Sequence, residues 1–180
     1  GWHRRGRATL TAINPCTPRH HGINAARGYT RSDSHPTGTT MRIRMAGATG
    51  LVGQGVLREV LADPRVTRVG VLGRRGTGND DPRVEDLQVE RFDALDGVAG
   101  RLAPWDACFY CAGAPPLGTP EAEYRHVTVA LTLQVARVFA ERNPGGRFLY
   151  VSGAHANPGS RLMPLRVKGE AEAALRALPI

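Results

Sequence analysis

Hydrophobic positions follow two different periods along the chain from Met41 onward. Short apolar runs suited to strands cover residues 41–46, 66–73, 87–93, 107–113 and 147–153. Segments with a single apolar stripe at helical spacing cover residues 51–62, 95–103, 121–143 and 167–178. This alternation of strands and helices predicts a parallel sheet with helices on both faces.

The segment 107–113, ACFYCAG, is apolar almost throughout, as is typical of a strand that helices cover on both faces. The expected fold is an α/β, doubly wound parallel sheet of the Rossmann type, with strand order 3-2-1-4-5. A chain of 180 residues, 41% of them hydrophobic, is long enough for one such domain over residues 41–180. It contains no run of about 18 apolar residues, so we expect no membrane span.

Residues 1–40 show neither period. They are rich in Gly, Pro, His and Thr and hold six arginines against one acid, Asp33, so we predict a disordered basic tail. An arginine-rich, acid-poor leader of this kind resembles an organellar transit peptide. The plainer interpretation is that Met41, directly before the first strand, is the natural start and that residues 1–40 are upstream sequence.

The net charge of +8 and the sequence pI of about 10.4 suggest nucleic-acid binding, but the distribution argues against it. Residues 41–180 hold 18 basic and 15 acidic groups, so we expect no nucleic-acid partner. Three cysteines, Cys16, Cys108 and Cys111, do not suit a disulfide scaffold and favour a reducing, cytoplasmic location. Cys108 and Cys111 lie in one strand without further zinc ligands, so we expect core packing and no metal site.

The segment MAGATGLVGQG joins the first strand to the first helix and contains Gly47-x-x-Gly50-x-x-Gly53. Glycines at such a turn permit a tight bend, let the backbone approach a diphosphate, and bring helix and strand together. The amino end of the following helix offers free N–H groups and a partial positive charge. This placement predicts a dinucleotide-binding loop, whereas a glycine turn needed only for packing is the plainer alternative.

Three stretches, GATGLVG (47–53), YVSGA (150–154) and RVKGEAEAAL (166–175), resemble the extended and atypical short-chain dehydrogenase/reductase superfamily. The last two are most similar to the branch of Tat-interacting-protein-like oxidoreductases and bacterial nucleoside-diphosphate-sugar epimerase-like proteins. The resemblance covers residues 41 to about 178. In the loop it implies cofactor contacts from Gly47, Thr49, Gly50, Leu51, Val52 and Gly53.

The end of the second strand, VLGRRGTG, bears on the choice of cofactor. An acidic residue there would bind the ribose 2′-hydroxyl of NAD, but no acid follows until Asp80. Arg74 and Arg75 occupy the region, and a guanidinium can bind a 2′-phosphate through two hydrogen bonds. We therefore expect NADP, with NAD as the alternative cofactor, unless both arginines are solvated loop charges.

The third and fourth strands carry further candidate cofactor residues. Asp93 is expected to end the third strand, and the resemblance implies that it contacts the adenine amino group. A helix N-cap for the residues that follow is the alternative role for Asp93. The resemblance also places Cys111, Ala112 and Gly113 beside the adenosine ribose, because small residues let the backbone approach a ligand.

Lys168 is the only lysine among 24 basic residues. In the resembled family a lysine holds the nicotinamide ribose, a tyrosine four residues earlier transfers the proton, and a serine orients the substrate carbonyl. Lys168 matches the lysine and Ser152 lies near the serine position, so both are candidate catalytic residues. The tyrosine position is Pro164, which has no ionisable group. Nothing in the sequence brings Tyr124 or Tyr150 to that place.

Two functions remain open from the sequence. One is an NAD(P)-dependent oxidoreductase or epimerase-like protein that exchanges hydride with a small carbonyl or alcohol substrate. The other is a non-catalytic dinucleotide-binding sensor or regulatory module, which the loss of the tyrosine favours. The family's substrate region follows a sixth strand, which would begin near Ile180, so we expect that region to be absent. A homodimer is a further expectation, because helices beside the last two strands pair subunits in this superfamily.

Overall fold

The computed structural model describes residues 8–13 and 40–178. Its parallel strands are β2 (Met41–Ala46), β3 (Val66–Gly73), β4 (Val84–Gln88), β5 (Ala107–Tyr110) and β6 (Arg147–Gly153). They lie in the order β4-β3-β2-β5-β6, which is the predicted order 3-2-1-4-5. The doubly wound Rossmann sheet is therefore confirmed.

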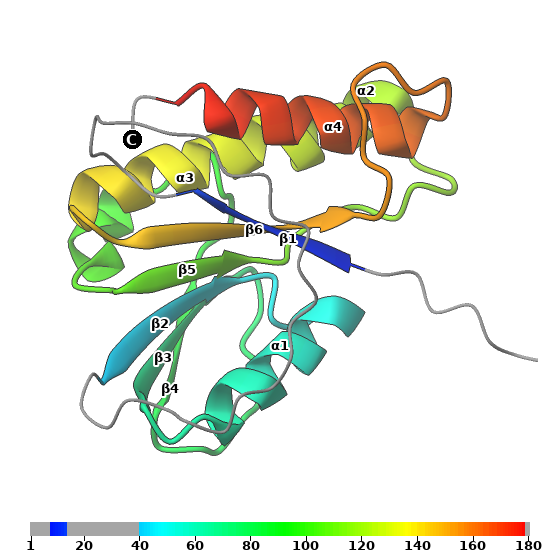
Figure 1. Ribbon diagram of the computed structural model, residues 1–180. Helices are drawn as coiled ribbons and strands as arrows, with labels where there is room; N and C mark the ends of the chain where they lie inside the picture. Colours follow the sequence, from blue (N-terminus) through cyan, green and yellow to red (C-terminus); the bar gives the residue numbers. More distant parts are fainter. Residues whose placement is uncertain (1–7, 14–39, 179–180) are drawn as a thin grey trace, which may run out of the picture.

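A sixth strand, β1 (Ala8–Ile13), pairs antiparallel with β6 at the edge of the sheet (Figure 1). The register places Ala8 opposite Gly153 and Ile13 opposite Phe148. This strand was not predicted, because its alternating segment ATLTAI is short and stands in a stretch rich in Gly, Pro, His and Arg. For the other residues before Thr40, the predicted disorder lies outside the described residues.

Helices cover both faces of the sheet, as Figure 1 shows. One face carries α1 (Leu51–Ala62). The other carries α2 (Glu121–Arg125), the π-helical turn η2 (His126–Ala130), α3 (Leu131–Arg142) and α4 (Met163–Arg176). A short 3₁₀ helix, η1 (Asp96–Leu102), precedes β5. Within the described ranges, no helix is both long and apolar enough to cross a membrane.

The core consists of two clusters, one on each face of the sheet. Side chains alternate along a strand, so Ile43 and Met45 of β2 face α1, whereas Ala46 faces α3. The α3 side also contains the large aromatic residues of the core, Trp105, Tyr110, Phe139, Phe148 and Tyr150. Burial on both faces explains why the strand segments are apolar almost throughout.

Several element boundaries differ from the sequence expectation. The strand expected at 87–93 is β4, which spans Val84–Gln88. Its start was missed because the strand lies at the edge of the sheet and carries polar residues, Glu85 and Asp86, which bind Arg68 and Thr77. The last helix begins at Met163, four residues earlier than expected. Pro164 is tolerated in its first turn, where the missing N–H would have no helical partner.

Candidate functional site

The candidate site lies where the carboxyl ends of the parallel strands meet. β2 is the central strand, and the chain passes from it to β3 on one side and to β5 on the other. A crevice at this reversal of strand order is the usual ligand position in doubly wound folds. The turn from β2 to α1, which contains Gly47 and Gly50, lies at this place.

Gly47 needs to be glycine for two reasons. Its φ angle is 80°, in the region that other residues rarely adopt. A β-carbon there would lie 2.4 Å from the backbone nitrogen of Ala112 and 2.8 Å from the carbonyl carbon of Cys111. The turn therefore packs directly against the backbone that follows β5, which joins two of the predicted cofactor segments.

Gly53 and Gly50 have different roles in the same loop. A β-carbon on Gly53 would lie 2.0 Å from the carbonyl oxygen of Gly47, so α1 packs backbone to backbone on the turn. Gly50 faces open space, because a β-carbon there would meet only the carbonyl oxygen of Gly47, at 3.5 Å. Gly50 is the N-cap of α1 and makes no side-chain cap, so the first N–H groups of the helix point at a space that can admit a diphosphate.

The side chains around this turn point in two directions. Thr49 lies on the side of the loop after β3, and its carbonyl accepts a hydrogen bond from Gln54 Nε2 at 3.1 Å. Leu51 is 91% exposed, and Leu51 and Val52 line an apolar cavity of about 840 Å³ between α1 and β5. Leu51 and Val52 can therefore serve a dinucleotide only through their backbone N–H groups.

A cavity of about 300 Å³ lies on the far side of β3 from Thr49. The structure brings to it four of the residues predicted for the cofactor, Arg74, Asp93, Ala112 and Gly113. The other lining residues were not indicated by the sequence; three of them, His126, Val127 and Leu131, come from the helical segment after β5. Its position beside the end of β3 suits an adenine ring, and the assignment of these residues to a cofactor stays a prediction.

His126, Val127 and Leu131 belong to the π-helical turn η2 and the start of α3. A π turn inserts one extra residue into a helix and often occurs at functional sites. Its sequence, HVTVA, is ordinary for a helix, so no sequence signal could have indicated the change of face. The predicted single helix over 121–143 is therefore interrupted beside the cavity.

Asp93 lies in the loop between β4 and η1, and not at the end of a strand as expected. Its carboxylate accepts hydrogen bonds from Arg91 at 2.8 and 2.5 Å, which lower the pKa of Asp93 to about 2. The N-cap of η1 is Leu95 without a side-chain cap, so the alternative role of Asp93 as a helix cap is wrong. Asp93 remains a charged hydrogen-bond acceptor on the cavity wall.

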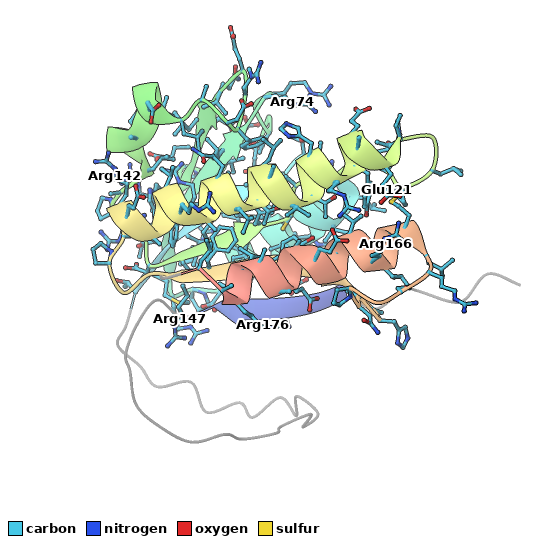
Figure 2. All side chains as sticks on the ribbon, turned by 90° about the horizontal axis from the view of Figure 1, so that it is seen from above. Arg74, Glu121, Arg142, Arg147, Arg166 and Arg176 are labelled. Atoms are coloured by element: carbon cyan, nitrogen blue, oxygen red, sulfur yellow. The ribbon has the colours of Figure 1, made fainter. Side chains whose placement is uncertain are left out.

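Arg74 and Arg75 are neighbours in the chain but line different cavities. Arg74 lines the one that contains Asp93, and Arg75 lines another of about 590 Å³ beside Thr49. Figure 2 shows Arg74 beyond the α2–α3 helix, on the side away from α4. The sequence could not separate the two arginines in this way.

Cys108 and Cys111 lie on opposite faces of the sheet, in the α3-side and α1-side clusters respectively. Both are free thiols, and burial raises their pKa values to about 12 and about 11. The Cys111 backbone N–H donates to Ala46 at 2.8 Å, so it belongs to the sheet. Among the described residues, no group of three acidic, histidine or cysteine side chains could hold a metal ion.

Lys168 and Ser152 meet at the carboxyl end of β6. Lys168 Nζ donates to the carbonyl of Val151 at 3.5 Å and lies 5.6 Å from the ring centre of Tyr150. Ser152 is 4% exposed, and its hydroxyl has no hydrogen-bond partner among the described residues. Burial lowers the pKa of Lys168, and Glu172 opposes that shift only in part. The two predicted catalytic residues therefore both lie at the carboxyl end of β6, Ser152 in the strand and Lys168 on α4 beside it.

No tyrosine in the described part of the chain occupies the position from which a proton would be transferred. Pro164 lies in the first turn of α4. Tyr124 and Tyr150 are buried in the core, and burial raises the pKa of both phenols. Neither tyrosine lines the cavities that contain Arg74 or Arg75. The described site thus has polar groups for holding a ligand and lacks an exposed phenol.

Comparison with curated proteins finds relatives of low sequence identity. No family model matches the chain. It is 26% identical over 135 residues to leucinostatins biosynthesis cluster protein T of Purpureocillium lilacinum, covering 72% of this chain and 50% of that protein. It is also 26% identical over 144 residues to the mitochondrial protein fmp52 of Emericella nidulans, covering 76% of this chain and 60% of that protein.

Solved structures match the fold of the chain at lower sequence identity. Uronate dehydrogenase from Agrobacterium tumefaciens matches with a TM-score of 0.59 and 18% identity, over 76% of this chain and 54% of that one. The Bordetella bronchiseptica enzyme WbmF in complex with NAD⁺ and UDP matches with a TM-score of 0.58 and 16% identity, over 76% and 44%. The chain has the Rossmann fold, and it spans about half the length of the proteins it matches.

Proposed function

We propose that this chain binds a nicotinamide dinucleotide across the carboxyl edge of its sheet, with NADP preferred to NAD. It would serve an oxidoreductase or epimerase-like reaction of the atypical short-chain dehydrogenase type on a small carbonyl or alcohol substrate. The single observation that carries this proposal is the turn in which Gly47 and Gly53 leave no room for a β-carbon while Gly50 faces open space. Such a turn suits a diphosphate. Packing alone does not explain the glycine at position 50, because a side chain there would fit.

The residues around the turn suit the rest of a dinucleotide. The cavity that contains Asp93 offers a carboxylate to an adenine amino group, beside the apolar Val127 and Leu131. Lys168 would donate hydrogen bonds to the ribose next to the nicotinamide, and the free hydroxyl of Ser152 would donate to a substrate oxygen. When bound, the nicotinamide would exchange a hydride with the substrate carbon.

A second candidate function is a dinucleotide-binding module that turns nothing over. Pro164 favours it, because the position lacks the phenol that would deliver a proton to the substrate oxygen. The two functions share the glycine turn and differ only in hydride transfer. We place the protein in a reducing compartment such as the cytoplasm, since the cysteines of β5 and its continuation are free thiols.

The test of dinucleotide binding is thermal unfolding with and without cofactor. A ligand at a hundredfold excess over its Kd adds about 2.7 kcal/mol, which is about 5–10 °C in Tm for a domain of this size. We expect NADPH to raise Tm more than NADH does. Gly50→Asp should remove the response, because it places a carboxylate against the diphosphate.

The matched control is Gly55→Asp, which adds the same charge to the same helix at a position with nothing within 4 Å. It should keep the response to NADPH. A Gly50→Asp protein that is folded and still responds would contradict the proposal. Incubation of the oxidised cofactor, NADP⁺, with UDP-glucose or UDP-glucuronic acid deuterated at C4 of the sugar then asks whether the alcohol carbon gives its deuterium to the nicotinamide. Deuterium on the nicotinamide, or lost from C4, supports the enzyme, and an unchanged label with tight cofactor binding favours the binding module.

A further inference from the structure

Four charged side chains join the starts of α2 and α4 at the carboxyl edge of the sheet. Each helix contributes one acid and one base, four residues apart: Glu121 and Arg125 from α2, and Arg166 and Glu170 from α4. Arg166 Nη2 donates to both carboxylate oxygens of Glu121, at 3.0 and 2.9 Å. Arg125 binds Glu121 at 2.6 Å and also contacts Glu170. Opposite charges therefore alternate around this four-charge cluster, and Figure 2 shows Arg166 and Glu121 close to each other.

The start of α4 lacks two features that usually stabilise the amino end of a helix. Its N-cap, Leu162, makes no side-chain hydrogen bond, and its first turn contains no acid. Arg166 instead places a positive charge near that end, which the helix dipole disfavours. The same guanidinium donates from Nη1 to the carbonyl of Ser160 at 3.2 Å, in the loop that leads into α4. The start of α4 is therefore held from outside the helix, by α2 and by this loop, and Arg166 makes both connections.

The position of Lys168 depends on this part of α4. Lys168 follows Arg166 by two residues, so the two side chains leave the helix in different directions. The stem of Lys168 lies against the end of β6, since a β-carbon on Gly153 would lie 3.2 Å from Lys168 Cδ. Its Nζ donates to the carbonyl of Val151 at 3.5 Å and has no other hydrogen-bond partner among the described residues. A shift of the start of α4 would therefore move this weakly held ammonium relative to Ser152.

We propose that Arg166, held by Glu121, is a positioning residue that keeps Lys168 where it can bind the ribose next to the nicotinamide. This inference rests on the proposed function and adds two residues to which the sequence analysis gives no role. Arg166 contacts neither the cofactor nor Lys168, and it acts through the place of the first turn of α4. A planar guanidinium suits this task, because it binds the carboxylate of α2 with one nitrogen and the carbonyl of the loop with another.

The test compares two ligands of the full chain by calorimetry: NADPH, which carries the nicotinamide ribose, and 2′,5′-ADP, which lacks it. Arg166→Gln should weaken NADPH about threefold to tenfold and leave 2′,5′-ADP within about twofold. Glu121→Gln removes the same contact from the other helix and should have the same selective effect. Arg166→Lys keeps the charge without the planar fork and should lose less than Arg166→Gln. A general distortion of the fold would instead weaken both ligands alike.

The decisive variant combines Arg166→Gln with Lys168→Met. If Arg166 acts through Lys168, its substitution has nothing left to disturb once the ammonium is gone. The double variant should therefore bind NADPH within about twofold of Lys168→Met alone. Arg176→Gln is the matched control, because Arg176 makes an ion pair with Glu172 at 3.0 Å in the last turn of the same helix. It should change neither affinity by more than about twofold.

The outcomes separate this inference from the proposed function. A folded wild-type chain that binds neither NADPH nor NADH overturns both. Unchanged NADPH affinity in Arg166→Gln overturns the positioning role and leaves dinucleotide binding intact. A loss that is equal for NADPH and 2′,5′-ADP, or that recurs in full in the Lys168→Met background, overturns the positioning role in the same way. Circular dichroism shows whether each variant is folded, and Glu121→Gln provides the same comparison if Arg166→Gln is not.

Discussion

The substitution Gly53→Ala tests the geometry on which the site depends. The added methyl carbon would lie 2.0 Å from the carbonyl oxygen of Gly47 and 2.8 Å from Cα of Ala48. Both are backbone atoms, which cannot rotate away as a side chain would. The turn and the helix must therefore separate by about 1 Å, which distorts both. Gly55→Ala places the same methyl two residues later in α1, with nothing within 4 Å.

The expected magnitudes follow from two opposing effects. Overpacking typically costs about 1–3 kcal/mol, and rigid backbone neighbours place Gly53→Ala near about 3 kcal/mol. Replacing a helical glycine by alanine gains about 0.5–1 kcal/mol. Gly53→Ala should therefore lose about 2 kcal/mol of unfolding free energy, whereas Gly55→Ala should gain up to about 1 kcal/mol. In Tm these are a fall of about 4–8 °C and a rise of about 1–4 °C.

Urea unfolding followed by far-ultraviolet circular dichroism measures both free energies. The slopes should match that of the wild type, so that midpoints report stability alone. If Gly53→Ala is as stable as Gly55→Ala, the close contact between α1 and the turn does not exist. The third glycine would then have no structural role, and the diphosphate assignment would lose its geometric basis.

Two further predictions concern charged groups. Hydrogen bonds from Arg83 lower the pKa of Asp81 from 3.8 to about 2, so the folded state holds this carboxylate charged longer than the unfolded state does. Stability should therefore fall as the pH drops from about 4 to about 2, and Asp81→Asn should show a shallower fall in acid titrations followed by circular dichroism. Burial lowers the pKa of Lys168, so its charge opposes folding at neutral pH, and Lys168→Met should melt at or above the wild-type Tm. The same variant should bind NADPH about tenfold more weakly by calorimetry, and unchanged affinity would refute the ribose role.

The sheet could be predicted because its strands are buried on both faces and separated by helices with one apolar stripe. The prediction of strands failed at the two edges of the sheet, where burial on both faces does not impose an apolar sequence. β4 lies at an edge and holds Glu85 and Asp86 through ion pairs and hydrogen bonds, so its hydrophobic pattern is weak. β1 is a single short alternating segment in a leader rich in Gly, Pro, His and Arg, and its pairing with β6 depends on a distant partner.

The core also contains a charge that no sequence rule indicates. Arg44 is 2% exposed, with its guanidinium 4.0 Å from the ring centre of Trp105 and its Nη2 donating to the carbonyl of Arg101 at 2.5 Å. Gly70 makes room for the pair, since a β-carbon there would lie 2.5 Å from the indole and 2.6 Å from Arg44 Nη1. Arg44 lies between the apolar residues Ile43 and Met45. The pattern of this strand does not tell whether such an arginine stacks on a buried aromatic ring or faces solvent.

The residues of the candidate site also fall into those that the sequence predicts and those that it does not. Gly47, Gly50 and Gly53 could be predicted, because their spacing expresses backbone conformation directly. His126 and Leu131 could not, because their positions depend on a π turn within an ordinary helical sequence. Backbone motifs are local in sequence, whereas the walls of a cavity come from elements that only the fold brings together.

This division bears on how binding and catalysis are related in the chain. A grip on a diphosphate depends on backbone N–H groups, so it tolerates most side-chain changes and fails only when a β-carbon enters the turn. Proton transfer in the resembled family depends on one tyrosine side chain, and this chain has Pro164 at the corresponding position, in the first turn of α4. Lys168 and Ser152 still lie together at the end of β6, where an unpaired buried hydroxyl costs stability unless a ligand or water satisfies it. The unpaired hydroxyl of Ser152 therefore favours a polar ligand at that end of the sheet, whether or not the ligand is chemically changed there.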